Sequence, residues 1–120
     1  MSTNRIRLLV AFEIHDGKFS EFEAIAKQMV AVSEKEPGTI AYNFVLSADR
    51  KHCRLVEGYR DAAAVTAHFH GPAVQQFVPQ LTRVSNVALM EFYGDPGPEV
   101  TAMAKPFNAA IFTEFEGFDR

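Results

Sequence analysis

A histidine within a predicted helix, His68, is the residue best suited to carry chemistry in this sequence of 120 residues. Counting 100° per residue from Val65 and Phe69 places His68 at the rim of the apolar face of that helix. A side chain at the rim can contact both a pocket and water. Its ordinary pKa of about 6.5 suits the removal of a phenolic proton at neutral pH. The alternative is a partly buried histidine that is bonded to a backbone carbonyl.

Two further candidates lie on one face of a predicted strand, because Glu57 and Tyr59 alternate with Cys53 and Leu55 at a period of two. Tyr59 could stack on a planar substrate and donate a hydrogen bond to it, or it could simply be an amphipathic residue at the end of the strand. Glu57 is either a hydrogen-bonded carboxylate of structural use or an acid and base with a raised pKa.

Asn43 is an unusual residue for the middle of a strand, where asparagine is disfavoured. It shares a face with the small side chains of Ala41 and Val45, which would leave room for a ligand. An amide in that position could orient a carbonyl or phenol oxygen. An exposed strand position without function is the alternative.

The sequence has many phenylalanines, 11 in all, and no tryptophan. Most of them are expected in the core. Phe69, Phe77 and Phe107 could line an apolar pocket. The candidate substrate-binding residues are therefore Asn43, Glu57, Phe69 and Phe77.

Metal and cofactor sites are not predicted. His70 points about 200° away from His68 on a regular helix, so the two imidazoles cannot hold one metal ion, and no HxxxH or HExxH spacing is present. A glycine-rich phosphate loop and a dinucleotide fingerprint are missing as well. We expect no metal, flavin or nicotinamide.

Composition excludes several classes of partner. The net charge is −3 and the sequence contains no run of basic residues, which argues against nucleic-acid binding. No apolar stretch approaches the roughly 20 residues that cross a bilayer, and the N-terminus lacks the apolar core of a signal peptide. The single cysteine, Cys53, fits a reducing compartment. We expect a cytoplasmic protein.

The hydrophobic pattern predicts an α+β domain of ferredoxin-like type, with the order β-α-β-β-α-β and an antiparallel sheet. Alternating apolar residues mark the strands, and apolar residues three and four apart mark the helices. Pro79 is expected to kink or split the last helix. The predicted strands are 6–14, 39–48, 52–60 and 86–93, and the predicted helical regions are about 19–35, 62–70 and 72–84.

The C-terminal part reads as an extension, 95–120, that follows a domain formed by 1–94. It begins with a Pro- and Gly-rich break and contains a helical turn, followed by a fifth strand at 109–118. A lone strand must pair, either with the edge of its own sheet or with a neighbouring subunit. Both faces of the first three strands carry apolar residues, yet two helices can cover only one face, so the pattern predicts a partner subunit.

Several segments together resemble the antibiotic biosynthesis monooxygenase (ABM)-like family. They are Glu-Pro-Gly-Thr-Ile-Ala-Tyr at 36–42, Val-Glu-Gly-Tyr-Arg-Asp at 56–61, Ala-His at 67–68, Gly-Pro at 71–72, and Phe77. The resemblance in element order covers 5–94. It implies a homodimer that forms a dimeric α+β barrel, with the C-terminal extension contacting the partner subunit.

The resemblance also implies a function: a cofactor-independent monooxygenase that acts on a small aromatic quinol or phenol. His68 would be the base, while Tyr59 (at a position that is often a pocket Trp in the family) and Asn43 would hold the substrate. The first strand lacks the Asn of the haem-degrading branch, which argues against haem as substrate. The alternatives are an isomerase or other proton-transfer enzyme, and a non-catalytic dimeric ligand-binding or stress-related module.

Overall fold

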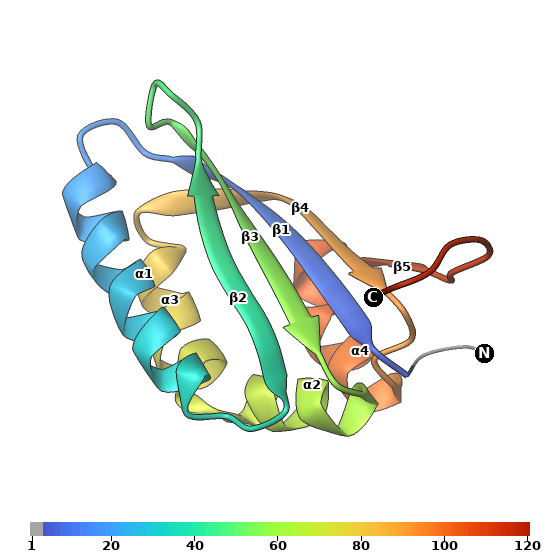
Figure 1. Ribbon diagram of the computed structural model, residues 1–120. Helices are drawn as coiled ribbons and strands as arrows, with labels where there is room; N and C mark the ends of the chain where they lie inside the picture. The colour runs from blue at the N-terminus through green and yellow to red at the C-terminus, as the bar shows by residue number, and fades with distance from the viewer. Residues whose placement is uncertain (1–3) are drawn as a thin grey trace.

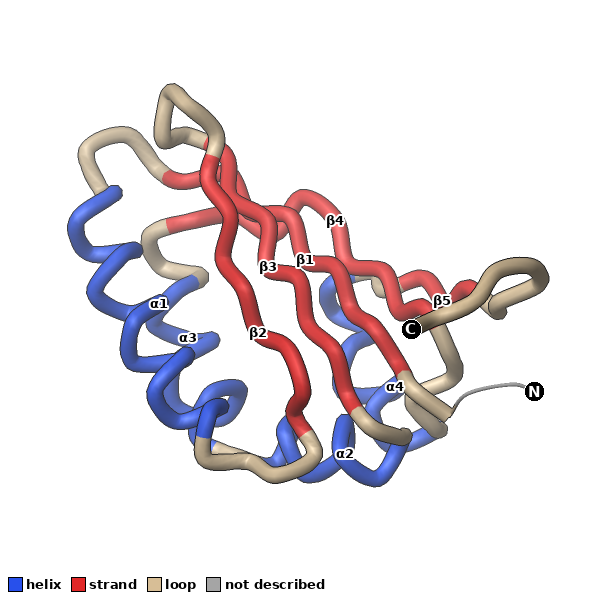
Figure 2. Tube along the Cα trace, in the orientation of Figure 1, coloured by secondary structure: helices blue, strands red, loops and turns tan. Residues whose placement is uncertain are grey.

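One sheet of five strands carries all the helices on a single face (Figures 1 and 2). The computed structural model describes residues 4–120. The strand order is β2-β3-β1-β4-β5, so β3, β1 and β4 lie inside the sheet. The strands are β1 (Ile6–Ile14), β2 (Thr39–Leu46), β3 (His52–Tyr59), β4 (Ser85–Tyr93) and β5 (Ala110–Phe112). The helices are α1 (Phe19–Glu34), α2 (Ala62–His70), η1 (Ala73–Phe77), α3 (Val78–Leu81), α4 (Pro98–Ala104) and η2 (Lys105–Phe107).

The first four strands confirm the ferredoxin-like α+β prediction. β1 pairs antiparallel with both β3 and β4, and β2 pairs antiparallel with β3. A period of two along β1 buries Ile6, Leu8, Val10 and Phe12 against the helices. The core of the molecule therefore lies between the sheet and the helical layer.

The fifth strand is much shorter than the predicted 109–118, and it pairs within its own chain. β5 lies parallel to β4, so the sheet is mixed and not antiparallel throughout. The reason is the connection: α4 and η2 carry the chain back along β4, and such a crossover brings the next strand in with the same direction. The backbone N–H of Gly94 also donates to the carbonyl of Phe112 over 2.8 Å.

The helices begin and end close to the predicted positions. α1 buries Phe22, Ala26, Met29 and Ser33 at helical spacing. The side chain of Asp61 accepts a hydrogen bond from the N–H of Ala64 and so caps α2. The last helical region is divided into η1 and α3, as the proline in it predicted.

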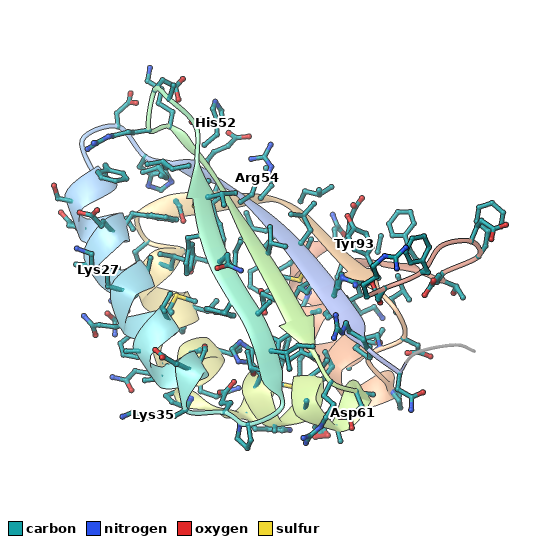
Figure 3. All side chains as sticks on the ribbon, viewed as in Figure 1. Lys27, Lys35, His52, Arg54, Asp61 and Tyr93 are labelled. Carbon is teal, nitrogen blue, oxygen red and sulfur yellow. The ribbon has the colours of Figure 1, made fainter. Side chains whose placement is uncertain are left out.

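The sheet face opposite the helices is exposed and partly apolar. Val45 is 51% exposed, Val56 40%, Leu89 39% and Tyr93 38%. Figure 3 labels Arg54 and Tyr93 on the strands, away from Lys27 on α1 and Lys35 just after it. We call this surface the open face. Within residues 4–120, no helix is long and apolar enough to cross a membrane.

Candidate functional site

An apolar cavity of about 50 Å³ lies between the sheet and the helical layer. Strand residues such as Val10, Leu55 and Met90 form one wall, and Met29 of α1 contributes to the opposite side. Three polar side chains reach this cavity, those of Tyr42, Glu57 and His68. The chemistry available to a ligand is therefore set by these few groups in an otherwise water-excluding space.

His68 is fully buried, with 1% of its surface exposed, so the expected rim position with access to water was wrong. The cause is tertiary: α2 packs against β2 and β3, and the rings of Tyr42 and Tyr59 lie beside the imidazole. The Nδ1 atom of His68 lies 2.7 Å from Oε1 of Glu36. Because a carboxylate can only accept, Nδ1 carries the hydrogen, which leaves Nε2 with a free lone pair.

Glu36 is the partner that sequence reasoning missed. It lies in the turn after α1, 20% of its side chain is exposed, and Oε1 also accepts a hydrogen bond from Thr39 Oγ1 over 2.7 Å. Gly38 lets this turn approach α2, because a Cβ at Gly38 would lie 2.5 Å from the Cβ of Ala64. The Glu-Pro-Gly segment is thus more than a helix stop, since it brings a carboxylate to the histidine.

Glu57 is buried beside the other side of the imidazole. It is 3% exposed, and its Oε1 lies 3.8 Å from Nε2 of His68. Tyr59 donates a short hydrogen bond to the same oxygen. Burial raises the pKa of Glu57 to about 8, a rise that the bond from Tyr59 opposes and the charge of Glu36 supports. Glu57 is therefore protonated at neutral pH.

The pKa of His68 shifts in the opposite direction to that of Glu57. Burial lowers the pKa of His68, and Glu36 only partly offsets this effect through its hydrogen bond and its charge. His68 is consequently a neutral base at neutral pH, next to a neutral carboxylic acid. The two environments shift the two pKa values in opposite directions, so His68 can accept a proton and Glu57 can donate one within the same site.

Two tyrosines flank the imidazole. The ring centroid of Tyr42, which packs against the core, lies 5.2 Å from that of His68. Tyr59 is fully buried behind Glu57, 5.3 Å from the imidazole, and is not part of the cavity wall. Burial, then the charge of Glu57, raises the pKa of both tyrosines. Tyr59 thus holds Glu57 in place.

The remaining candidates divide between the cavity and other places. Phe69 lines the cavity, and so does Phe107, whereas Phe77 is buried in the core outside the cavity wall. Asn43 pairs with Val56 on β3, on the open face, and so points away from His68 of its own chain. Within residues 4–120, no group of three His, Cys, Asp or Glu side chains is arranged to hold a metal ion.

Comparisons with known proteins agree with this architecture. A sequence model of the antibiotic biosynthesis monooxygenase family matches residues 5–80. MupZ from Pseudomonas fluorescens superposes over 100% of this chain and 92% of its own, with a TM-score of 0.84 and 18% identity. SnoaB from Streptomyces nogalater, a cofactor-independent oxygenase, superposes over 80% of this chain and 97% of its own, with a TM-score of 0.68 and 15% identity.

A third structure, Rv0793 from Mycobacterium tuberculosis, superposes over 76% of this chain and 94% of its own, with a TM-score of 0.68 and 22% identity. At these identities the likeness to solved structures concerns the fold. The sequence has no significant match among curated proteins.

Proposed function

Because the chain belongs to the antibiotic biosynthesis monooxygenase family, we propose that it is a cofactor-independent monooxygenase that acts on a small quinol or phenolic aromatic substrate. The observation that carries the proposal is the buried imidazole of His68, which is fixed by Glu36 on Nδ1 and has a free Nε2 at the cavity. A base of this kind can take a phenolic proton in a dry site.

The first step is proton transfer. The substrate hydroxyl donates to Nε2 of His68, and its proton moves to that nitrogen as the phenolate forms. Glu36 stabilises the resulting imidazolium through the bond of 2.7 Å to Nδ1. The apolar walls exclude water, so the electron-rich anion is left to react with oxygen.

The second step forms the carbon–oxygen bond. The phenolate, through its ring carbon, transfers electrons to O2 and gives a hydroperoxide at that carbon. The imidazolium of His68 supplies the proton of this hydroperoxide. The O–O bond then breaks as the neutral His68 removes the remaining hydrogen of that carbon as a proton, which leaves a carbonyl and one water molecule. The proton now on His68 restores the acid that protonated the departing oxygen. The substrate loses four electrons, and these reduce O2 to the carbonyl oxygen and one water molecule, so the balance requires no further reductant. Glu57, protonated and 3.8 Å from the imidazole, is placed to donate the proton that leaves with water.

The test is oxygen uptake by metal-free protein over a panel of quinols and anthrones, with His68→Gln compared against His70→Gln. His70 is the matched control because it lies exposed on the same helix and bonds to Glu99 instead. Loss of a general base lowers the rate about 10²- to 10⁴-fold, so His68→Gln should lose uptake and His70→Gln should keep it. Equal rates in the two variants would remove His68 from the mechanism.

A second function is favoured by one specific observation, the pairing of a neutral base with a neutral acid across 3.8 Å. His68 and Glu57 could remove a proton at one atom of a small metabolite and return one at another, as an isomerase does. Oxygen dependence separates the two functions, because an isomerase converts its substrate equally well under nitrogen.

We also propose that the protein is a homodimer whose subunits pack through their open faces. The support is the apolar character of that surface, where Val45, Val56, Leu89 and Tyr93 are each more than a third exposed. The tail after β5 extends the same region, since Phe118 is 76% exposed and Arg7 forms an ion pair with Asp119. In this arrangement Asn43 would face the partner subunit.

A further inference from the structure

Phe107 stands between the cavity and a second hollow on the surface. The same two side chains, Phe107 and Val87, line both the apolar cavity of about 50 Å³ and an open hollow of about 330 Å³ beside it. Phe107 and Val87 therefore form the part of the wall that the cavity next to His68 shares with this hollow. The hollow lies where β4 begins and η2 ends.

The backbone that carries Phe107 is well anchored, whereas its ring is only partly buried. Val100 and Ala104 of α4 are fully buried in the core, which fixes the segment up to η2. Asn108 then adopts a left-handed conformation, with φ of 55°, and turns the chain towards β5. The ring of Phe107 packs against the edge of the core. A rotation of this side chain, without movement of the backbone, can open the wall.

The volumes indicate what such an opening would achieve. Sites for small molecules typically measure about 300–1,000 Å³, which is well above the cavity alone. The cavity and the hollow together fall within that range. A substrate with one or two rings is larger than the cavity alone, and a movement of the Phe107 ring would add the space of the hollow to it.

The wall of the hollow indicates the chemistry of the part that would remain outside. Besides Phe107, Val87 and Pro106, it consists of uncharged polar residues: Thr82, Ser85, Asn86 and Asn108. Among the residues that the structure describes, 4–120, no charged side chain lines it. Neutral hydroxyl or amide groups on a ligand suit this surface, while an anionic group would find no cation to pair with.

We propose that Phe107 is the gate and size-determining residue of the site, and that the ligand is an aromatic ring system with an uncharged polar extension. The ring system would enter past Phe107 to reach His68, and the extension would lie in the outer hollow. The proposal rests on the function proposed above in so far as the cavity is the substrate site, but its test measures binding and not turnover.

The probes are 2-naphthol, 2-naphthyl β-D-glucoside and 2-naphthyl phosphate, followed by stopped-flow fluorescence and by spectra of ¹³C-methyl methionine. Met29 and Met90 line the cavity, so their methyl signals show whether a probe has entered it. The protein variants are Phe107→Ala, Phe107→Trp and the control Phe115→Ala, whose ring is 95% exposed in the tail.

We expect Phe107→Ala to bind 2-naphthol with an association rate at least about tenfold faster than the unmodified protein, and Phe107→Trp about tenfold slower. The control should be unchanged. The neutral glucoside should bind to Phe107→Ala with an affinity close to that of 2-naphthol, and the phosphate about tenfold more weakly.

Equal association rates in all four proteins, or binding without a shift of the Met29 and Met90 signals, would overturn the gate. The proposal would also be overturned if neither the unmodified protein nor Phe107→Ala bound 2-naphthol. The methionine spectra also report folding, and Phe107→Trp keeps the test decisive if the alanine variant unfolds. Because no catalysis is measured, these outcomes are independent of whether oxygen is consumed.

Discussion

Replacing Glu57 by Gln should stabilise the protein, and the gain should grow as the pH rises. The pKa of Glu57 is raised from 4.5 to about 8 by burial, so the folded state holds a proton that the unfolded chain releases above pH 4.5. Stability from this group is therefore fully present below pH 4.5 and is lost as the pH rises towards 8. Glutamine has nearly the same shape, accepts the bond from Tyr59 and does not ionise.

The size of the effect follows from the two pKa values. Between pH 5 and pH 8 the folded state holds a proton on Glu57 that the unfolded chain has largely released. For each pH unit in which the two states differ by one proton, the free energy of unfolding changes by about 1.4 kcal/mol. The free energy of unfolding of Glu57→Gln, relative to the unmodified protein, should thus increase by roughly 3 kcal/mol between pH 5 and pH 8. His68 has the opposite effect on stability. Its pKa is lowered in the folded state, so it destabilises the protein as the pH falls.

The assay is urea unfolding of both proteins at equal concentration across this pH range, followed by circular dichroism. Glu34→Gln is the control for the loss of one carboxylate, because Glu34 lies exposed on α1. A constant difference for Glu57→Gln would refute the reasoning. It would mean that Glu57 is ionised in the folded state, as an ion pair with a protonated His68.

Two predictions concern the site and the proposed interface. Glu36→Gln should lower kcat about tenfold or more with little change in KM. It should also move the acidic limb of the pH–rate profile to lower pH, because Glu36 raises the pKa of His68. An acidic limb at the same pH in both proteins would contradict the contact between Glu36 and His68. Val56→Asp should convert the dimer to a monomer in sedimentation experiments, whereas Val30→Asp, at a valine 36% exposed on α1, should leave the dimer intact.

The order of the elements could be predicted from the sequence because each element has a clear period. Apolar residues alternate along β1 and recur at three and four residues along α1, and these patterns correspond to what is buried. The same argument correctly placed Glu57 on the inner face of β3 together with Cys53. Periodicity fixes which face a side chain occupies, since it depends only on the local backbone.

The composition of the site could not be predicted in the same way. Glu36 and His68 are 32 positions apart in the sequence. They meet because the turn that carries Glu36 packs closely against α2, where Gly38 approaches Ala64. The burial of His68 depends on Tyr42 of β2 and Tyr59 of β3, whose rings pack beside the imidazole from other elements. Contacts between elements decide these features, and periodicity within one element carries no information about them.

The most direct test of the central claim is the fate of the oxygen atoms from ¹⁸O2 when metal-free protein turns over a quinol or anthrone that it consumes. The account predicts one ¹⁸O atom in the product carbonyl and one in water, with the labelled product lost in His68→Gln and retained in His70→Gln. Product without label, or conversion at the same rate under nitrogen, would contradict the monooxygenase function and favour proton transfer by His68 and Glu57 instead.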